Sequence, residues 1–420
     1  MYLIPPLFFM GLFFWFWKTH KGLDLCTYMT SLYVVNTLFS VYIIAMELLG
    51  SGGILFTNAD AVFGIVPSML FCLSIGIVLF PFSLIHVREI KQITIRAPWA
   101  VDTLSLVLMA LSFVNLYLVV DSMFDILSGD LGQLRQEHYA GAPSPAQLKA
   151  ETLPFIVRFF FYFQQSTILA LPIFFYNVCF RKKPWWWNGA LLFASLTCPI
   201  AGIQVADRTE FVFYGIMALY CVVMFHHFFT QKLKRRLIMV CIPIAVLGVV
   251  YVTAVSASRF DENSGTSPME RNIQYTGQAY ANFCYFYENA QPDLYSAERE
   301  LPMFHHFIKH RDSTPERRAQ RMSEHGFFIS VFASFAGDIM LDIGIDGLLL
   351  WVLCFFLLTT LIIRRSHRDE FDISEVLVIF MLSVVPLFGI FYYRYHTFLG
   401  TFAMLLVLGV FFVSLKKKKE

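Results

Sequence analysis

The sequence predicts an all-α polytopic membrane protein with about eleven transmembrane helices and a large, partly helical loop on the outer side. Composition is the first reason: 57% of the 420 residues are hydrophobic, 17% are aromatic and the mean hydropathy is +0.61. A soluble chain of this length could not bury so much apolar surface. Apolar runs of roughly 20 residues, long enough to cross the hydrocarbon core, also recur along the chain. Finally, Lys and Arg gather between these runs.

Each apolar run is expected to be a helix, because lipid offers backbone N–H and C=O groups no other partner. The expected spans are 2–17, 25–49, 61–85, 101–120, 154–179, 189–205, 210–229, 237–255, 343–363, 372–391 and 397–415. The first has no basic segment before it and no small-residue cleavage site after it, so we interpret it as a retained membrane segment. If it lay on the membrane surface instead, the rest of the topology would stand.

Positive charge predicts the orientation of these spans. Nineteen of the 32 Lys and Arg residues fall in six short segments that end or separate the apolar runs. They are 18–24, 86–98, 180–187, 230–236, 364–370 and 416–420. The positive-inside rule places all six in the cytoplasm. The basic residues form no continuous stripe, so nucleic acid is not an expected partner.

This orientation divides the chain into three parts. A bundle of about eight spans, 1–255, precedes a large outer loop, 256–342, and the last spans and a basic tail form 343–420. The loop is too long to be a passive connection and is expected to contain helices at 270–290 and 315–325. The eight cysteines show no metal-binding or paired spacing, so neither a zinc site nor a disulfide framework is predicted.

Two arginines lie apart from the segments that are predicted to be cytoplasmic. Arg208 in QVADRTEF and Arg394 in YYRYHT both lie on the predicted outer side, between spans. With His396, they suit a diphosphate, because guanidinium groups make forked contacts with phosphate oxygens. An ion pair with Asp207 or Glu210 is the alternative explanation for Arg208. An interfacial aromatic belt is the alternative for the tyrosines around Arg394.

The outer loop supplies further candidates. Arg259 lies just past a span, and Arg271 opens the stretch RNIQYTGQAYANFCYFYENA. Tyr275 and Asn282 recur on one face of the predicted helix, which we expect along the membrane interface. The other basic residues of the loop are also explained by a solvated surface, because long translocated loops largely escape the positive-inside rule.

An acidic stretch follows the loop. Asp338, Asp342 and Asp346 stand four residues apart, so one unbroken helix would place them on one face, leading into the next span. Stacked like charges should raise at least one pKa, which makes a carboxylate a better proton acceptor near neutral pH. His325 is another candidate base. The alternative is that these acids only mark where the helix leaves the membrane.

Four stretches resemble the O-antigen polymerase (Wzy) type of polysaccharide polymerase, a family related in architecture to the O-antigen ligases. They are VADRTEFVFY at 205–214, a large loop with SRF at 258–260, IQYTG at 273–277 and ANF at 281–283, then FISVFASFAGDIMLDIGIDG at 328–347, and YYRYH at 392–396. The resemblance covers about half of the chain, from near 200 to the end. Family members often have more spans than this chain.

The resemblance implies a membrane glycosyltransferase of the GT-C kind in the bacterial inner membrane, with its active site facing the periplasm. Its substrates would be oligosaccharides on undecaprenyl diphosphate, joined into lipopolysaccharide or capsule chains. Arg208 would hold diphosphate oxygens, Arg259 or Arg271 would assist, and Asp338 and Asp342 would lie by the acceptor. A regulator of chain length is a candidate partner, besides the bilayer itself.

The expected roles are therefore specific. The candidate catalytic residues are Asp338, Asp342 and His325, and the candidate diphosphate- or glycan-binding residues are Arg208, Arg259, Arg271, Tyr275, Asn282, Arg394 and His396. No phosphate loop, GxSxG, HExxH or DxD-type metal pair appears in a plausible context, so catalysis without a metal or cofactor is expected.

Three other functions remain open. An O-antigen ligase would use the same chemistry on a different acceptor. A lipid-linked oligosaccharide flippase or transporter would place charged residues within broken spans, whereas these spans are nearly free of charge. A membrane acyltransferase would need a histidine deep in a span, and none is seen.

Overall fold

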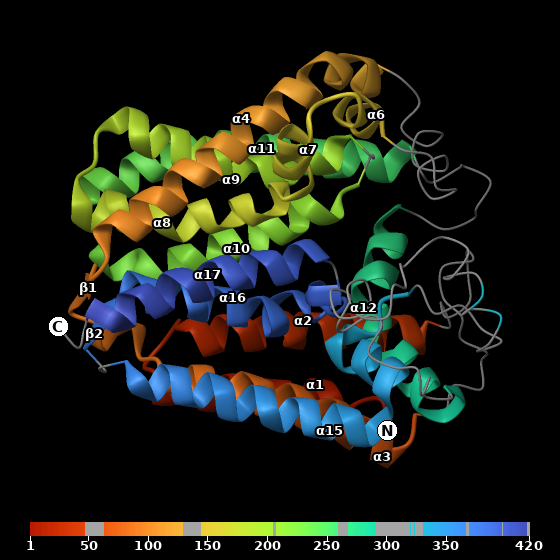
Figure 1. The fold of residues 1–420 in the computed structure, drawn as a ribbon. Coiled ribbons are helices and arrows are strands. Elements are labelled where there is room, and N and C mark those ends of the chain that lie inside the picture. The colour runs from red at the N-terminus through yellow and green to blue at the C-terminus, as the bar shows by residue number, and fades with distance from the viewer. Residues whose placement is uncertain are drawn as a thin grey trace. The chain divides into compact units, whose positions relative to one another are not determined.

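The apolar runs fold into helices in the computed structural model. It describes residues 1–46, 63–128, 144–204, 207–258, 268–290, 320, 323, 331–366, 369–396 and 398–417. These residues are mostly helical, with one small parallel sheet in which β1 (Gln92–Thr94) pairs with β2 (Glu370–Asp372). Figure 1 shows these elements in their order along the chain. The predicted all-α class is confirmed at this level.

Seven helices of the described residues are long and apolar enough to cross a membrane, or eight if one bent pair counts as a span. They lie in α2 (Leu25–Ala45), α3 (Ile65–Leu79) with the turns after it, α4 (Pro98–Ser128), α9 (Trp185–Ile203), α10 (Thr209–Phe225), α11 (Gln231–Ser258) and α15 (Ser334–Arg365). Three further helices occupy other expected spans: α1 (Ile4–Thr19), α16 (Ile373–Phe388) and α17 (Phe398–Lys417). A multi-pass membrane protein follows, and the count of eleven stays a prediction.

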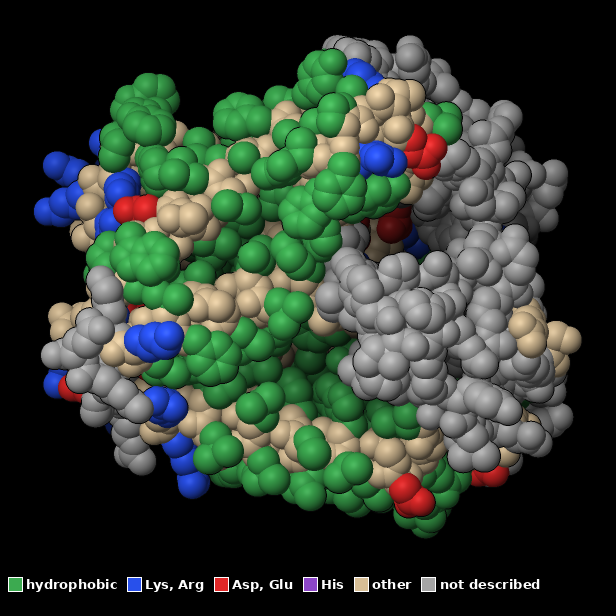
Figure 2. Space-filling view, in the orientation of Figure 1, with side chains coloured by type: hydrophobic (Ala, Val, Ile, Leu, Met, Phe, Trp, Pro, Cys, Tyr) green, Lys and Arg blue, Asp and Glu red, His purple; other side chains and the backbone are tan. Residues whose placement is uncertain are grey.

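Many helices carry hydrophobic side chains on their outer surfaces, as the face in Figure 2 shows. On α11, Met239 is 66% exposed and Leu247 is 69% exposed, and on α15 Leu361 is 68% exposed. Water would oppose so much exposed apolar surface, whereas lipid does not. The exposed side chains therefore agree with a membrane environment for these helices.

The first of two compact units comprises Met1–His86, Ser264–Arg368 and Leu382–Thr401. Within it, α12 (Pro268–Asn289) packs against α2, α3 and α15. A Cβ atom on Gly277 would lie 2.6 Å from the backbone carbon of Phe39, so only glycine allows this close approach of α12 to α2. Asn36 and Ser40 of α2 donate hydrogen bonds to carbonyl groups of α12. The helix predicted at 270–290 is confirmed, and it is a packed part of this unit.

The second unit comprises Val87–Asn263, Asp369–Met381 and Phe402–Glu420. Besides longer helices it contains α6 (Pro145–Glu151), α7 (Phe155–Tyr162), η4 (Gln164–Leu169), α8 (Ala170–Tyr176), η5 (Asn177–Arg181) and η6 (His226–Phe228). The run 154–179 is not one straight helix, because the chain bends by 55° between α7 and η4, and its crossing of the membrane as a single span stays a prediction. The hydroxyl of Thr167 donates to the carbonyl of Gln164 at the bend, a local bond that competes with regular helix.

Basic segments distant in sequence meet within the second unit. The strand pairing joins segment 86–98 to the residues after Arg368, and Arg96 forms an ion pair with Glu375 at 3.2 Å. Arg181 and Lys183 both bind the carboxylate of Asp102, the lysine at 3.1 Å. Segments that face the same side of a membrane can make such contacts. The pairing therefore agrees with the common side that the charge pattern predicts.

Candidate functional site

The acidic stretch at the start of α15 is broken at Gly344. This residue has φ 75° and ψ −178°, a backbone conformation open almost only to glycine. Asp338 and Asp342 precede the break and are fully buried, whereas Asp346 follows it and is exposed. The expectation that all three acids share one face of an unbroken helix is therefore wrong for Asp346. Only Asp338 and Asp342 remain one helical turn apart.

Backbone hydrogen bonds dock the start of α15 on the end of α16. Asp338 Oδ2 accepts a buried hydrogen bond from the backbone N–H of Tyr393 at 2.7 Å. The backbone N–H of Ser334 donates to the carbonyl of Phe391 at 2.9 Å. The carbonyl of Gly389 accepts from the next residue of α15, and a Cβ atom at Gly389 would overlap Val385 O. The buried acid is thus held against segment 389–393.

Arg394 follows directly on this segment and is only 6% exposed. Its guanidinium donates to the hydroxyl of Tyr392 at 2.8 Å and lies 5.4 Å from the ring centre of Phe388. A guanidinium over an aromatic face keeps its charge while most water is excluded. One short segment therefore carries both the amide that binds Asp338 and a buried cation.

Helix α12 contributes through the loop before α15. Asn282 Nδ2 donates to the carbonyl of Phe332 at 2.9 Å and to Gln278 Oε1 at 3.2 Å. The ring of Phe332 lies 5.9 Å from that of Tyr275 and stacks 5.8 Å from that of Tyr392. Asn282 is buried, and its observed contacts position the loop before α15, while its expected contact with glycan stays a prediction. Tyr275 is partly exposed and keeps its place as a candidate ligand contact.

Arg271 lies one turn before Tyr275 on α12 and is 8% exposed. The first unit therefore contains Arg271, Tyr275, Asp338, Asp342 and Arg394. Phe332 joins the α12 side to the α16 side through its ring contacts. Charged groups in so little water act more strongly on a ligand than they would in bulk solvent. We call this set, with Phe332 and Tyr392, the acid–arginine site.

Arg208 belongs to the second unit, where it precedes α10 and is 9% exposed. Asp207 Oδ1 accepts from the backbone N–H of Thr209 at 3.0 Å and from its hydroxyl at 2.8 Å. Glu210 Oε2 accepts from the thiol of Cys198 at 3.1 Å. The flanking acids thus have roles at the start of α10. The convergence of Arg208 with the acid–arginine site stays a prediction.

Some candidates lie outside the described residues. These are His325 and Arg259, the side chain of His396, and most of the helix expected at 315–325. Their roles stay predictions. Sequence reasoning missed Phe332 and the backbone N–H of Tyr393, because neither a lone Phe nor an amide group gives a sequence signal.

The thiol of Cys284 on α12 is not a suitable nucleophile. Burial raises the pKa of Cys284 to about 12, so the thiolate is scarce at neutral pH. Burial likewise raises the pKa of the Tyr395 hydroxyl well above its usual range. The proton-accepting role of Asp338 and Asp342 stays a prediction.

Comparison of the chain with protein-family models, with curated proteins and with solved structures found no match. The site combines two buried carboxylates, two largely buried guanidinium groups and aromatic rings. Such a set can bind a phosphate-bearing ligand and accept a proton from a hydroxyl group.

Proposed function

We propose that the protein is a metal-independent membrane glycosyltransferase of the GT-C kind. It would polymerise oligosaccharide repeat units carried on undecaprenyl diphosphate, at the periplasmic face of a bacterial inner membrane. The observation that carries this proposal is the hydrogen bond from the Tyr393 amide to Asp338, directly beside Arg394. This hydrogen bond connects the buried carboxylate of Asp338 to the segment that carries the buried guanidinium of Arg394. The reaction needs both an acid or base and a cation.

In this proposal the bond between the anomeric carbon and the diphosphate breaks as the acceptor hydroxyl attacks. Asp342 or Asp338 takes the hydroxyl proton, and the new bond joins the two sugar units. Negative charge grows on the leaving diphosphate, where Arg394, Arg271 and Arg208 stabilise it. Fixed cations do this best where water is sparse, because they need not reorganise during the reaction.

A ligase would transfer finished glycan by the same chemistry. A ligase and a polymerase differ in the acceptor that receives the glycan. Deleting a polymerase leaves single repeat units on the surface glycan, whereas deleting a ligase leaves none. A gel of surface polysaccharide from a deletion strain separates these outcomes.

A transporter of lipid-linked oligosaccharide is a second candidate, and one observation favours it. Transporters often use discontinuous helices with ionisable groups near the break. Here α15 is interrupted at Gly344, close to buried Asp342, and the chain is bent at 155–181. A transporter would move substrate across vesicles without making longer glycan.

The direct test uses the full-length protein in liposomes that contain a lipid-diphosphate oligosaccharide. We expect a ladder of longer products on a gel. Asp342→Asn should lower the rate by about 10²-fold or more, since a positioned acid or base contributes 10²–10⁴-fold. Asp346→Asn is the matched control, because that acid is exposed and lies beyond the break. Equal rates for the two variants would exclude Asp342 as the base, and substrate movement without longer products would contradict the proposal.

A further inference from the structure

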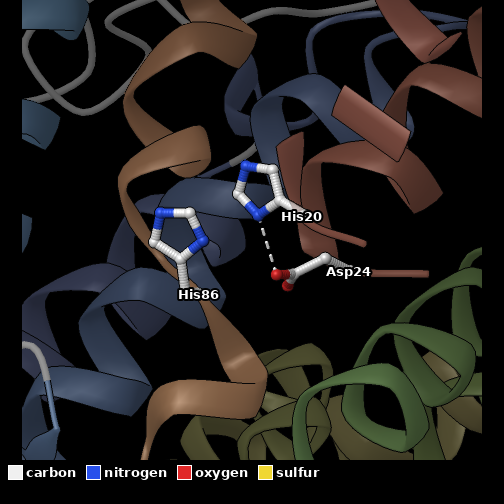
Figure 3. A group of neighbouring side chains, drawn as sticks. All are labelled: His20, Asp24 and His86. Carbon is white, nitrogen blue, oxygen red and sulfur yellow. Dashed lines mark hydrogen bonds and ion pairs between the residues drawn. The ribbon is translucent and has the colours of Figure 1, made fainter. Parts of the chain in front are cut away.

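A second group of ionisable side chains lies in the first unit. His20 and Asp24 belong to the turn between α1 and α2, and His86 follows η2 (Phe80–Leu84), the turn that extends α3. One potential ligand atom from each residue lies within 4.8 Å of the others, and Figure 3 shows the three side chains grouped together. His20 and Asp24 are almost fully buried, and His86 is partly buried. The proposed glycosyl transfer uses none of them.

The turn holds Asp24 in a defined position. Lys21 and Gly22 both have positive φ, which reverses the chain between the two helices. Asp24 then caps α2, with Oδ1 accepting from the backbone N–H of Leu25 at 2.6 Å. Its other oxygen, Oδ2, lies 2.9 Å from His20 Nδ1. The capping role therefore fixes one carboxylate oxygen and presents the second to the histidines.

The two imidazole rings are stacked, with centres 4.3 Å apart and planes inclined by 19°. Neutral imidazole nitrogen is the commonest protein ligand for transition metals, and a carboxylate supplies the balancing charge. Two histidines and one carboxylate form a frequent ligand set for zinc, with a position left for water.

We propose that His20, Asp24 and His86 bind a divalent transition metal ion of the zinc type. The ion would tie the α1–α2 turn to the end of α3. Ligand atoms around tetrahedral zinc lie about 3.4 Å apart for bonds near 2.1 Å, so small side-chain rotations would draw the group together. Metal binding at His20 Nδ1 would replace the His20–Asp24 hydrogen bond, with the single ring proton of neutral His20 held on Nε2.

The sequence did not predict this site. His20 and Asp24 are one helical turn apart in number, but His86 comes from a distant segment. The charge pattern assigns segments 18–24 and 86–98 to the cytoplasm, so the metal would come from that side. The proposed site therefore differs in location and role from the acid–arginine site, and its test needs no glycan substrate.

The test measures zinc binding by the full-length protein in detergent after treatment with a chelator. We expect one zinc ion per chain and a rise in the unfolding temperature, because the ion binds the folded state. His86→Phe keeps an aromatic ring against His20 but removes the ligand nitrogen. Losing only an outer partner of a metal ligand costs 10–100-fold in affinity, so we expect at least about a tenfold loss here. His226→Phe, the same change outside the cluster, should bind zinc like the wild type.

If His86→Phe does not accumulate, Asp24→Asn decides the matter, since its amide oxygen can still cap α2 while the negative charge is lost. We expect the same weakening of zinc binding. No zinc binding by the wild type would overturn the proposal. Unchanged zinc affinity in the variants of His86 or Asp24 would also overturn it. The three residues would then have only structural contacts: the His20–Asp24 hydrogen bond and the stacking of His20 on His86.

Discussion

Asp338 and Asp346 stand in the same sequence pattern, yet their surroundings differ completely. Asp338 is buried and accepts a backbone hydrogen bond from Tyr393, whereas Asp346 is exposed. The sequence pattern marked the stretch as a candidate site, but it could not tell which of the aspartates would be buried. That distinction depends on a hydrogen bond between residues 55 positions apart.

Arg394→Ala should lower the rate of glycan extension by about 10²–10³-fold, the loss expected when one donor to a developing oxyanion is removed. Arg394→Lys should restore little of it, because an ammonium group cannot make the forked contact. The measurement is initial rate in the liposome assay. A lysine variant as active as wild type would show that charge alone suffices.

Arg208→Ala should abolish long-chain polysaccharide in cells while the protein still inserts and accumulates. The side chain is buried at the start of α10, so immunoblotting of membranes must accompany the gel. Arg158→Ala, a cation elsewhere in the second unit, serves as a control. Normal ladders from the Arg208 variant would remove this residue from the mechanism.

At the scale of elements, the break in α15 and the contact between α12 and α2 both depend on single glycines. A repeating pattern of apolar residues predicts a helix through Gly344, and the chain is helical on both sides of this residue. The start of the same helix is hydrogen-bonded to the segment that follows α16. Local sequence does not contain that partner.

Gly344→Ala should destabilise the protein by about 1–3 kcal/mol, the usual cost of a side chain in this backbone region. Gly215→Ala is the matched control, because a Cβ atom there meets nothing within 4 Å inside α10. Alanine in a helix should be neutral or stabilising by up to about 1 kcal/mol. Thermal unfolding in detergent measures both, and equal stability of the two variants would contradict the observed break.

At the scale of the whole molecule, each compact unit is assembled from three separate stretches of chain. The division by sequence into 1–255, 256–342 and 343–420 follows membrane spans and loops. The units follow packing instead, so α12 from the large loop joins helices from the N-terminal end. Whether a segment is predicted to be a loop or a span therefore does not decide which helices it packs against.

Topology is tested with reporter tags at 56, 233 and 290. We expect the tag at 233 in the cytoplasm and the other two outside, because residues 230–236 hold four basic side chains. The reporter signals in intact cells and in permeabilised cells give the sides directly. A tag at 233 on the outer side would invert the predicted site and remove the periplasmic assignment.

The sequence by itself determined the membrane class and most helix positions, and it predicted a common side for the basic segments. These properties follow from local hydropathy and charge, because each segment inserts into the bilayer according to its own apolar length and flanking charges. Only the tertiary structure decided that Asp338 is held by the Tyr393 amide, that Asn282 supports a loop, and that His86 meets His20 and Asp24. Those contacts join residues far apart along the chain, and a hydrogen bond or a stacked ring leaves no periodic pattern in sequence.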